Sequence, residues 1–183
     1  VGVVAQKDSN IEDPTVSDLE DIGTIAKVVK LIKMPDGGTT VIIQGKKRFR
    51  ISSITSEDPF FKASIEVLPE EATPDDENFK ALAGSIKDMA AQIIQLSPNI
   101  PSEASIILKN IENPVFLVHF VSNNLNSDIK EKQRLLETHT IRQRAELLLT
   151  LLQKELQYTE LKNKVTNKTR TELDKQQRDY FLQ

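Results

Sequence analysis

The chain has 183 residues, with 24 basic and 27 acidic side chains and a formal net charge of -3. This balance gives no overall field that would demand nucleic acid or an anionic membrane as a partner. The absence of cysteine excludes disulfides and thiolate metal sites, and it fits a cytoplasmic location, with the mitochondrial matrix as an alternative. The longest apolar runs fall far short of the roughly 20 residues of a membrane span, so we expect no membrane partner.

The first third of the sequence is rich in β-branched residues and turn signals. Apolar and polar residues alternate around Phe49 and again over residues 61–67, which places one set inside and the other in water. The sequence Pro35-Asp36-Gly37-Gly38 supplies a hairpin turn. The strand patterns cover residues 1–7, 23–34, 39–44 and 61–67. We therefore expect a small twisted sheet or partial barrel over residues 1–68.

A helical region follows an acidic linker at residues 69–78. Thr73 is followed by Pro74 and two aspartates, which predicts a helix start capped by the threonine hydroxyl. From Phe79 to Leu96, large apolar residues recur at intervals of three and four, as on one face of an amphipathic helix. Asn113-Pro114 starts another helix, and Ser127 is a candidate cap for the next. The prediction is a helical bundle over residues 79–139.

The remainder of the chain contains no proline after Pro114 and no glycine, so no strong breaker interrupts a helix there. Thr140 and Gln143 have the spacing of a capping box, which predicts one long helix over residues 140–183. Its last part is too polar to be held by its own core, and we expect a projecting neck that joins the chain to a larger protein. A sparse stripe of large side chains is a candidate pairing seam: Tyr158, Leu161, Val165, Leu173 and Tyr180.

No set of residues has the spacing of a catalytic, cofactor or metal site. The glycines of the first third lack the spacing of a phosphate-binding loop. The paired acids of the linker are expected in solvent rather than in a buried catalytic pair. His119 and His139 have no second ligand at helical spacing, so ordinary packed or surface roles are favoured for both. We predict no catalytic, cofactor-binding or metal-binding residue.

Three apolar side chains are candidates for contact with unfolded polypeptide. Phe60 and Phe61 are adjacent, so alternation cannot bury both on one face of a strand, and Met34 lies beside the predicted turn. Exposed apolar groups match many hydrophobic segments without reading their sequence. The alternative is that these side chains pack beneath the acidic loop at residues 8–21 or against the helical region.

A basic run offers a second candidate surface. Alternation points Arg48 and Arg50 to the same side of a strand, and with Lys46 they form a candidate nucleic-acid contact. A solvated or ion-paired strand face is favoured over this interpretation. The chain is acidic overall, and its aromatic content of 5% leaves few stacking platforms for bases.

Six short segments resemble, in order, parts of the amino-terminal domain of Lon proteases. They are VGVVAQKD at 1–8, IGTIA at 22–26, IQGKKRFRI at 43–51, EKQRLLE at 131–137, RAELL at 144–148 and QRDYFL at 177–182. The resemblance implies a PUA-like β domain, a helical bundle and a long helix leading to the ATPase ring of an ATP-dependent serine protease. It also implies a role in selecting unfolded or damaged proteins for quality control and in supporting a hexamer. ATP and Mg are implied for the parent protein and not for this chain.

Two departures from the Lon pattern bear on these expectations. The strands that precede VGVVAQKD in the family are missing, so we expect an incomplete β domain with an unpaired edge. The ATPase motifs and the Ser-Lys dyad are missing too, so no catalytic residue is carried over. The prediction is an α+β fold and a non-catalytic substrate-recognition and assembly region of a Lon-type protease. The alternatives are a PUA-like nucleic-acid-binding module and a freestanding Lon-like adaptor domain.

Overall fold

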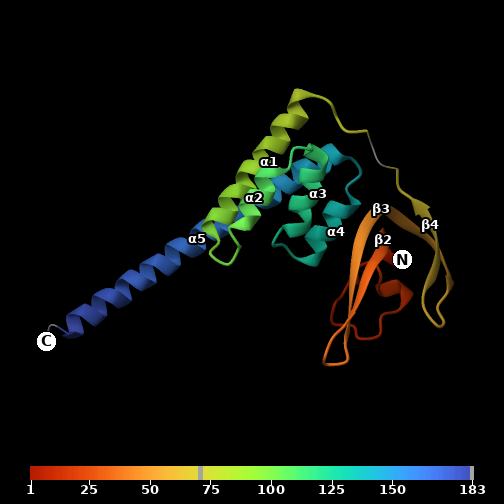
Figure 1. The fold of residues 1–183 in the computed structure, drawn as a ribbon, viewed down its shortest axis with the longest axis horizontal. Coiled ribbons are helices and arrows are strands. Elements are labelled where there is room, and N and C mark those ends of the chain that lie inside the picture. Colours follow the sequence, from red (N-terminus) through yellow and green to blue (C-terminus); the bar gives the residue numbers. More distant parts are fainter. Residues whose placement is uncertain (70–71, 182–183) are drawn as a thin grey trace. The chain divides into compact units, whose positions relative to one another are not determined.

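A computed structural model describes the backbone of residues 1–69 and 72–181, and the side chains of these residues as far as Lys175. Strands come first and helices follow, so the predicted α+β fold class is confirmed (Figure 1). Contacts divide the chain into two compact units. Unit 1 comprises Val1–Ala72 and Asp128–Thr138, and unit 2 comprises Thr73–Ser127 and His139–Gln183.

Within its described residues, unit 1 holds a four-stranded antiparallel sheet whose strands follow chain order. The elements are β1 (Gly2–Val3), a 3-10 turn (Val16–Asp18), β2 (Ile22–Lys33), β3 (Thr39–Ser56) and β4 (Lys62–Val67). The predicted hairpin is confirmed: Lys33 lies opposite Thr39, and Gly37 has φ 88°, which suits glycine. The strand predicted over residues 1–7 is too long. After Val3 the chain bends, and Gln6 forms only an isolated bridge with Leu19.

Strand β3 is long enough to have different partners along its length. Its first part pairs with β2, and the part from Phe49 to Ser56 pairs with β4. On the other side of β2, strand β1 pairs only with Thr24 and Ile25. Beside this pairing, the Val1 amino group donates a hydrogen bond to the Ala26 carbonyl oxygen. Residues 27–33 and 39–44 therefore form a two-stranded arm that no other described strand flanks (Figure 1). We call it the β2–β3 arm.

Helix α4 (Ile129–Glu137) belongs to unit 1 and is tied to the sheet by two side chains. The side-chain amide of Gln133 donates a hydrogen bond to the Ile22 carbonyl oxygen at 3.0 Å. The Arg48 guanidinium donates to the carbonyl oxygens of Leu136 and Thr138 at 2.8 and 3.0 Å, which satisfies acceptors at the end of the helix. The bundle predicted over residues 79–139 includes α4, whereas these contacts group α4 with the sheet.

Unit 2 is built from helices, most of which begin with a side-chain cap. The helices are α1 (Glu77–Leu96), α2 (Glu103–Asn110), α3 (Pro114–Asn124) and α5 (Ile141–Phe181). Asp76 caps α1 by accepting from the Phe79 amide at 2.8 Å, so the cap predicted at Thr73 is wrong by three residues. The predicted helix start at Asn113-Pro114 and the Thr140–Gln143 capping box of α5 are confirmed, and the Asn113 side chain caps α3. In unit 1, Asp128 and not Ser127 caps α4.

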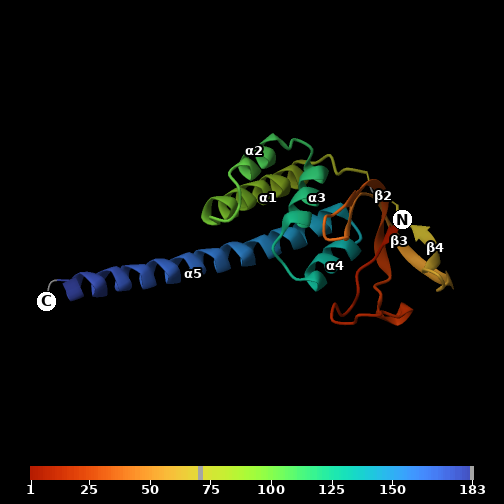
Figure 2. The same ribbon diagram turned by 60° about the horizontal axis from the view of Figure 1, so that its bottom comes forward.

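The core of unit 2 forms where α1 packs against α5 and α3. Its most deeply buried large side chains are Phe79, Ile86, Val118 and Leu148. Near the end of α1, the Asn163 amide donates to the Leu96 carbonyl oxygen at 2.9 Å. From Lys164 to Lys175 every side chain of α5 is exposed. Within unit 2, α5 thus continues past α1 without a covering layer, as the polar composition of the helix predicts (Figure 2).

Candidate functional site

The three apolar side chains singled out in the sequence are all exposed in unit 1. Met34 is 44% exposed beside the β2–β3 turn, where its amide donates to the Gly38 carbonyl oxygen at 2.8 Å. Phe60 and Phe61 are 62% and 42% exposed in the connection between β3 and β4. The Lys62 ammonium lies 5.0 Å from the centre of the Phe60 ring. Met34 and the phenylalanine pair thus lie at the turns of two different hairpins, and their role in binding stays a prediction.

The β2–β3 arm carries an apolar face that the sequence interpretation missed. Cross-strand partners share a face of a sheet, and so do residues two apart on one strand. Val28 lies opposite Ile43, Leu31 lies opposite Val41, and Val41 and Ile43 are two residues apart. These four side chains therefore project from one face, and each is at least 40% exposed. We call them the apolar face of the arm.

The opposite face of the arm mixes lysines with isoleucines. Lys30 lies opposite Ile42, Ile32 lies opposite Thr40, and Lys27 lies opposite Gln44. Ile32 and Ile42 are also exposed. The signal for two apolar faces was present in the runs Val28-Val29 and Val41-Ile42-Ile43, because such unbroken runs are typical of strands covered on both sides. In the described residues no layer covers either face.

Strand β4 also exposes apolar side chains. Arg48 points to α4, so its neighbour Phe49 points to the opposite face of the sheet, where Val67 is its cross-strand partner. Phe49 is buried, whereas Ile65 and Val67 are exposed. The expectation that alternation buries the apolar set of residues 61–67 is wrong, because alternation assigns a shared face and burial needs a second layer.

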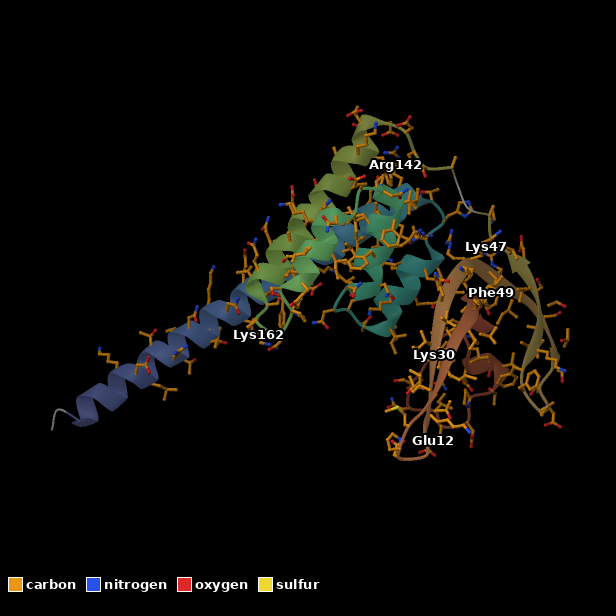
Figure 3. The ribbon with its side chains drawn as sticks, in the orientation of Figure 1. Glu12, Lys30, Lys47, Phe49, Arg142 and Lys162 are labelled. Carbon is orange, nitrogen blue, oxygen red and sulfur yellow. The ribbon has the colours of Figure 1, made fainter. Side chains whose placement is uncertain are left out.

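The basic run does not form one free surface. Arg48 is held by the carbonyl oxygens at the end of α4, so the three predicted nucleic-acid contacts do not act together: Lys46 and Arg50 are exposed, whereas Arg48 is only partly so. Residues 27–50 contain seven basic side chains and one acidic side chain. Figure 3 marks two of the cations, Lys30 on the arm and Lys47 on β3. Among the described residues, six of the seven make no ion pair: Lys27, Lys30, Lys33, Lys46, Lys47 and Arg50.

The side chains whose pKa values are shifted lie at helix starts and turns. The Phe79 amide, followed by the Arg142 guanidinium, holds the pKa of Asp76 below its ordinary value. Hydrogen bonds that the hydroxyl and the backbone amide of Thr15 donate to the Asp18 carboxylate lower the pKa of Asp18 in the acidic loop. Carboxylates of Asp75 and Glu77 raise the pKa of Lys80. Hydrogen bonds and charges that fix local structure account for all three shifts, and none requires a catalytic explanation.

The predicted seam on α5 lies in the open. Tyr158, Leu161, Val165 and Leu173 are each more than half exposed, and Tyr180 lies outside the residues whose side chains the structure describes. No group of three or more metal-ligating side chains gathers within the described ranges. No helix in those ranges combines the length and the hydropathy that crossing a bilayer requires. Pairing along the seam stays a prediction.

Comparisons with known proteins agree with this architecture. Residues 1–154 match the family described as the ATP-dependent protease La (LON) substrate-binding domain. The chain is 49% identical over 183 residues to a Lon protease of Flavobacterium johnsoniae and 42% identical over 184 residues to one of Cytophaga hutchinsonii. Each alignment covers 100% of this chain and 22% of the relative. The chain thus spans about a fifth of the length of the curated relatives it matches.

Two solved structures share the fold. The N-terminal domain of the Mycobacterium avium complex Lon protease superposes with a TM-score of 0.63 at 20% identity, covering 76% of this chain and 74% of that one. A Lon N-terminal domain protein from Xanthomonas campestris gives a TM-score of 0.52 at 15% identity, covering 75% and 71%. At these identities the likeness supports the α+β fold.

Proposed function

The chain belongs to the family of ATP-dependent protease La (LON) substrate-binding domains, and we propose that it captures exposed apolar segments of unfolded or damaged proteins for an ATP-dependent serine protease. The observation that carries this proposal is the display of large apolar side chains in unit 1, where a folded core would hide them. They include Val28, Leu31, Met34, Val41, Ile43, Phe60, Phe61, Ile65 and Val67.

The proposal extends to the whole protein of which this chain is part. The matching Lon proteases, of which the chain spans 22%, favour that parent over a freestanding adaptor. In this proposal the parent is a cytoplasmic hexamer that uses ATP and Mg, and this chain hydrolyses neither ATP nor peptide. The exposed part of α5 serves as a neck, with its seam pairing to a neighbouring subunit.

Capture by this surface is expected to be weak for one copy and strong for six. A few exposed apolar side chains give modest affinity, because each buries limited area and reads no sequence. Linking several copies raises the effective concentration of the second and later contacts, so avidity exceeds the affinity of one chain without any new contact. This arrangement suits a protein that has to hold many different clients briefly.

The test is binding of an unfolded client to the isolated chain. Reduced α-lactalbumin is titrated into the chain and into the double variant Phe60→Ser/Phe61→Ser, with Met34→Ser as a third protein. The control is Phe116→Ser, because Phe116 is 57% exposed on helix α3 of unit 2. We expect the double variant to bind about tenfold more weakly, since hydrophobic contact area is lost, and the control to bind normally. No binding by the unchanged chain would contradict the proposed function.

A further inference from the structure

The turn between β3 and β4 lies outside the hydrogen-bonded ladder of unit 1. Ser56 and Lys62 are the last cross-strand partners of the two strands, so residues 57–61 form the turn itself. The Ser56 hydroxyl donates to the Asp58 carbonyl oxygen at 2.8 Å, which stabilises the turn. A strand that joins a sheet pairs with ladder residues of an edge strand, so further strands beside this sheet would leave the turn at its end. We call residues 57–62 the Phe60–Phe61 turn.

The Phe60–Phe61 turn has two acids before its rings and a lysine after them. Glu57 and Asp58 are exposed and make no ion pair among the described residues. The Lys62 ammonium lies 5.0 Å from the centre of the Phe60 ring, where a cation meets the negative face of an aromatic ring. The turn therefore combines exposed apolar area, two carboxylates without an ion pair and a ring that already holds a cation.

A segment that is both apolar and basic fits this combination better than an acidic one. Its apolar side chains cover the two rings, and the loss of water-exposed area gives the main gain. Its basic side chains approach Glu57 and Asp58, where a guanidinium can donate two parallel hydrogen bonds to one carboxylate. A guanidinium also stacks well on an aromatic face. An acidic segment would instead meet like charge at both carboxylates.

We propose that the Phe60–Phe61 turn selects client segments in which apolar residues are flanked by arginine or lysine. This inference rests on the proposed function and names the class of segment that one of its contact sites takes. The carboxylates add preference and faster encounter rather than most of the affinity, because exposed charge pairs contribute little each. The formal net charge of -3 favours the approach of basic segments in the same way.

The first test compares two fluorescent peptides that share an apolar core and differ only in charge. The core has five alternating leucines and serines, and two arginines or two further serines flank it at each end. Fluorescence anisotropy measures binding to the chain at low salt and at 0.5 M salt. We expect the arginine-flanked peptide to bind about fivefold more tightly at low salt and within about twofold at 0.5 M, because salt screens exposed charges. Equal binding at low salt would overturn the inference.

A tripeptide that occurs twice supplies a matched control for the acids. Glu-Asp-Pro stands at 57–59 in the turn and at 12–14 in the acidic loop, where both acids are exposed and no aromatic residue follows (Figure 3 marks Glu12). Two double variants remove the same charge: Glu57→Gln/Asp58→Asn and Glu12→Gln/Asp13→Asn. We expect the first to bind the arginine-flanked peptide about fivefold more weakly and the second to stay within about twofold of the unchanged chain. Equal losses would indicate general attraction to an acidic chain and overturn the inference.

Lys62 offers a test in the direction of tighter binding. Its ammonium occupies one face of the Phe60 ring and repels a cationic client. Lys62→Gln removes that charge, so we expect the arginine-flanked peptide to bind about threefold more tightly and the serine-flanked peptide to stay within about twofold. Circular dichroism and thermal unfolding check that the variant folds. Unchanged or weaker binding of the arginine-flanked peptide by the folded variant would count against the inference.

The remaining comparisons separate this inference from the proposed function. If neither peptide prefers the unchanged chain but Phe60→Ser/Phe61→Ser still weakens binding of reduced α-lactalbumin, client capture stays and selection by charge falls. A preference for the arginine flanks that persists in Phe60→Ser/Phe61→Ser would place the selection away from the turn and overturn the inference. The same peptides are then compared on the longer protein to which the chain belongs. Loss of the preference there would show that other residues cover the turn, which also overturns it.

Discussion

The two units handle their apolar residues in opposite ways. In unit 2, helices α1, α3 and α5 bury large apolar side chains between them, among them Phe79, Ile86, Val118 and Leu148. In unit 1, the β2–β3 arm and β4 display residues of the same kind to solvent. A helix needs only one neighbour to bury its apolar stripe, whereas each face of a strand needs its own covering layer. Unit 2 thus buries its apolar residues in a core, whereas the proposed function assigns a binding role to those that unit 1 exposes.

The largest expected contrast comes from removing one aromatic ring in each unit. Phe79→Ala empties a fully buried site in unit 2 and should lower the free energy of unfolding by about 3–5 kcal/mol. Phe60→Ala removes a ring that is 62% exposed and should change it by less than about 0.5 kcal/mol. Urea unfolding followed by circular dichroism measures both. Similar losses for the two variants would contradict the division between a stabilising and a binding unit.

A second contrast lies within unit 1, between two arginines two residues apart. Arg48→Ala leaves the carbonyl oxygens of Leu136 and Thr138 without their donor and should cost about 1–3 kcal/mol. Arg50→Ala removes an exposed cation that makes no ion pair with the described side chains and should cost less than about 0.5 kcal/mol. Chemical unfolding measures the difference. If the two variants were equally stable, Arg48 would not hold α4 against the sheet.

Acid should weaken the start of α1 in unit 2 through Asp76. Its carboxylate accepts from the Phe79 amide and pairs with Arg142, and both interactions lower its pKa in the folded state below the ordinary value of 3.8. A group with a depressed folded pKa contributes stability above its unfolded pKa and loses it as pH falls through the folded value. Asp76→Asn should therefore lower the melting temperature at neutral pH and flatten its decline below about pH 4. Melting curves between pH 2 and 7 test this, and parallel curves for the two proteins would count against it.

Local signals in the sequence were enough to predict secondary-structure elements in both units. The Gly37 turn, the helix start at Asn113-Pro114 and the Thr140–Gln143 box each depend on residues within a few positions, and the structure has all three. The placement of α4 depends on Gln133 reaching Ile22, which lies 111 positions away, and no periodicity encodes that contact. The cap of α1 is Asp76 and not the predicted Thr73. Both residue types suit that role, and Arg142, which lies far along the chain, pairs with Asp76.

The candidate surface was only partly predictable for a related reason. Adjacent Phe60 and Phe61 had to leave at least one ring exposed, and the structure exposes both. The apolar face of the arm was missed because Val41-Ile42-Ile43 has the pattern of a buried strand. A pattern reports which side chains prefer to be covered, and it carries no information about whether a layer is there to cover them. Long-range packing decides that question.

The last contrast lies within α5 itself, between a buried leucine and an exposed one. Leu148 is fully buried and Leu173 is 55% exposed on the same helix. Leu148→Ala should cost about 2–5 kcal/mol, whereas Leu173→Ser should change the free energy of unfolding by less than about 0.5 kcal/mol.

The proposed seam predicts the oligomeric state that accompanies this result. Because its large side chains are sparse, pairing along α5 is weak, and light scattering should show a monomer or weak dimer at micromolar concentration. Leu173→Ser should shift any dimer toward monomer without changing the melting temperature. A stable hexamer of the isolated chain would show instead that other surfaces drive assembly and that the exposed part of α5 is a connector alone.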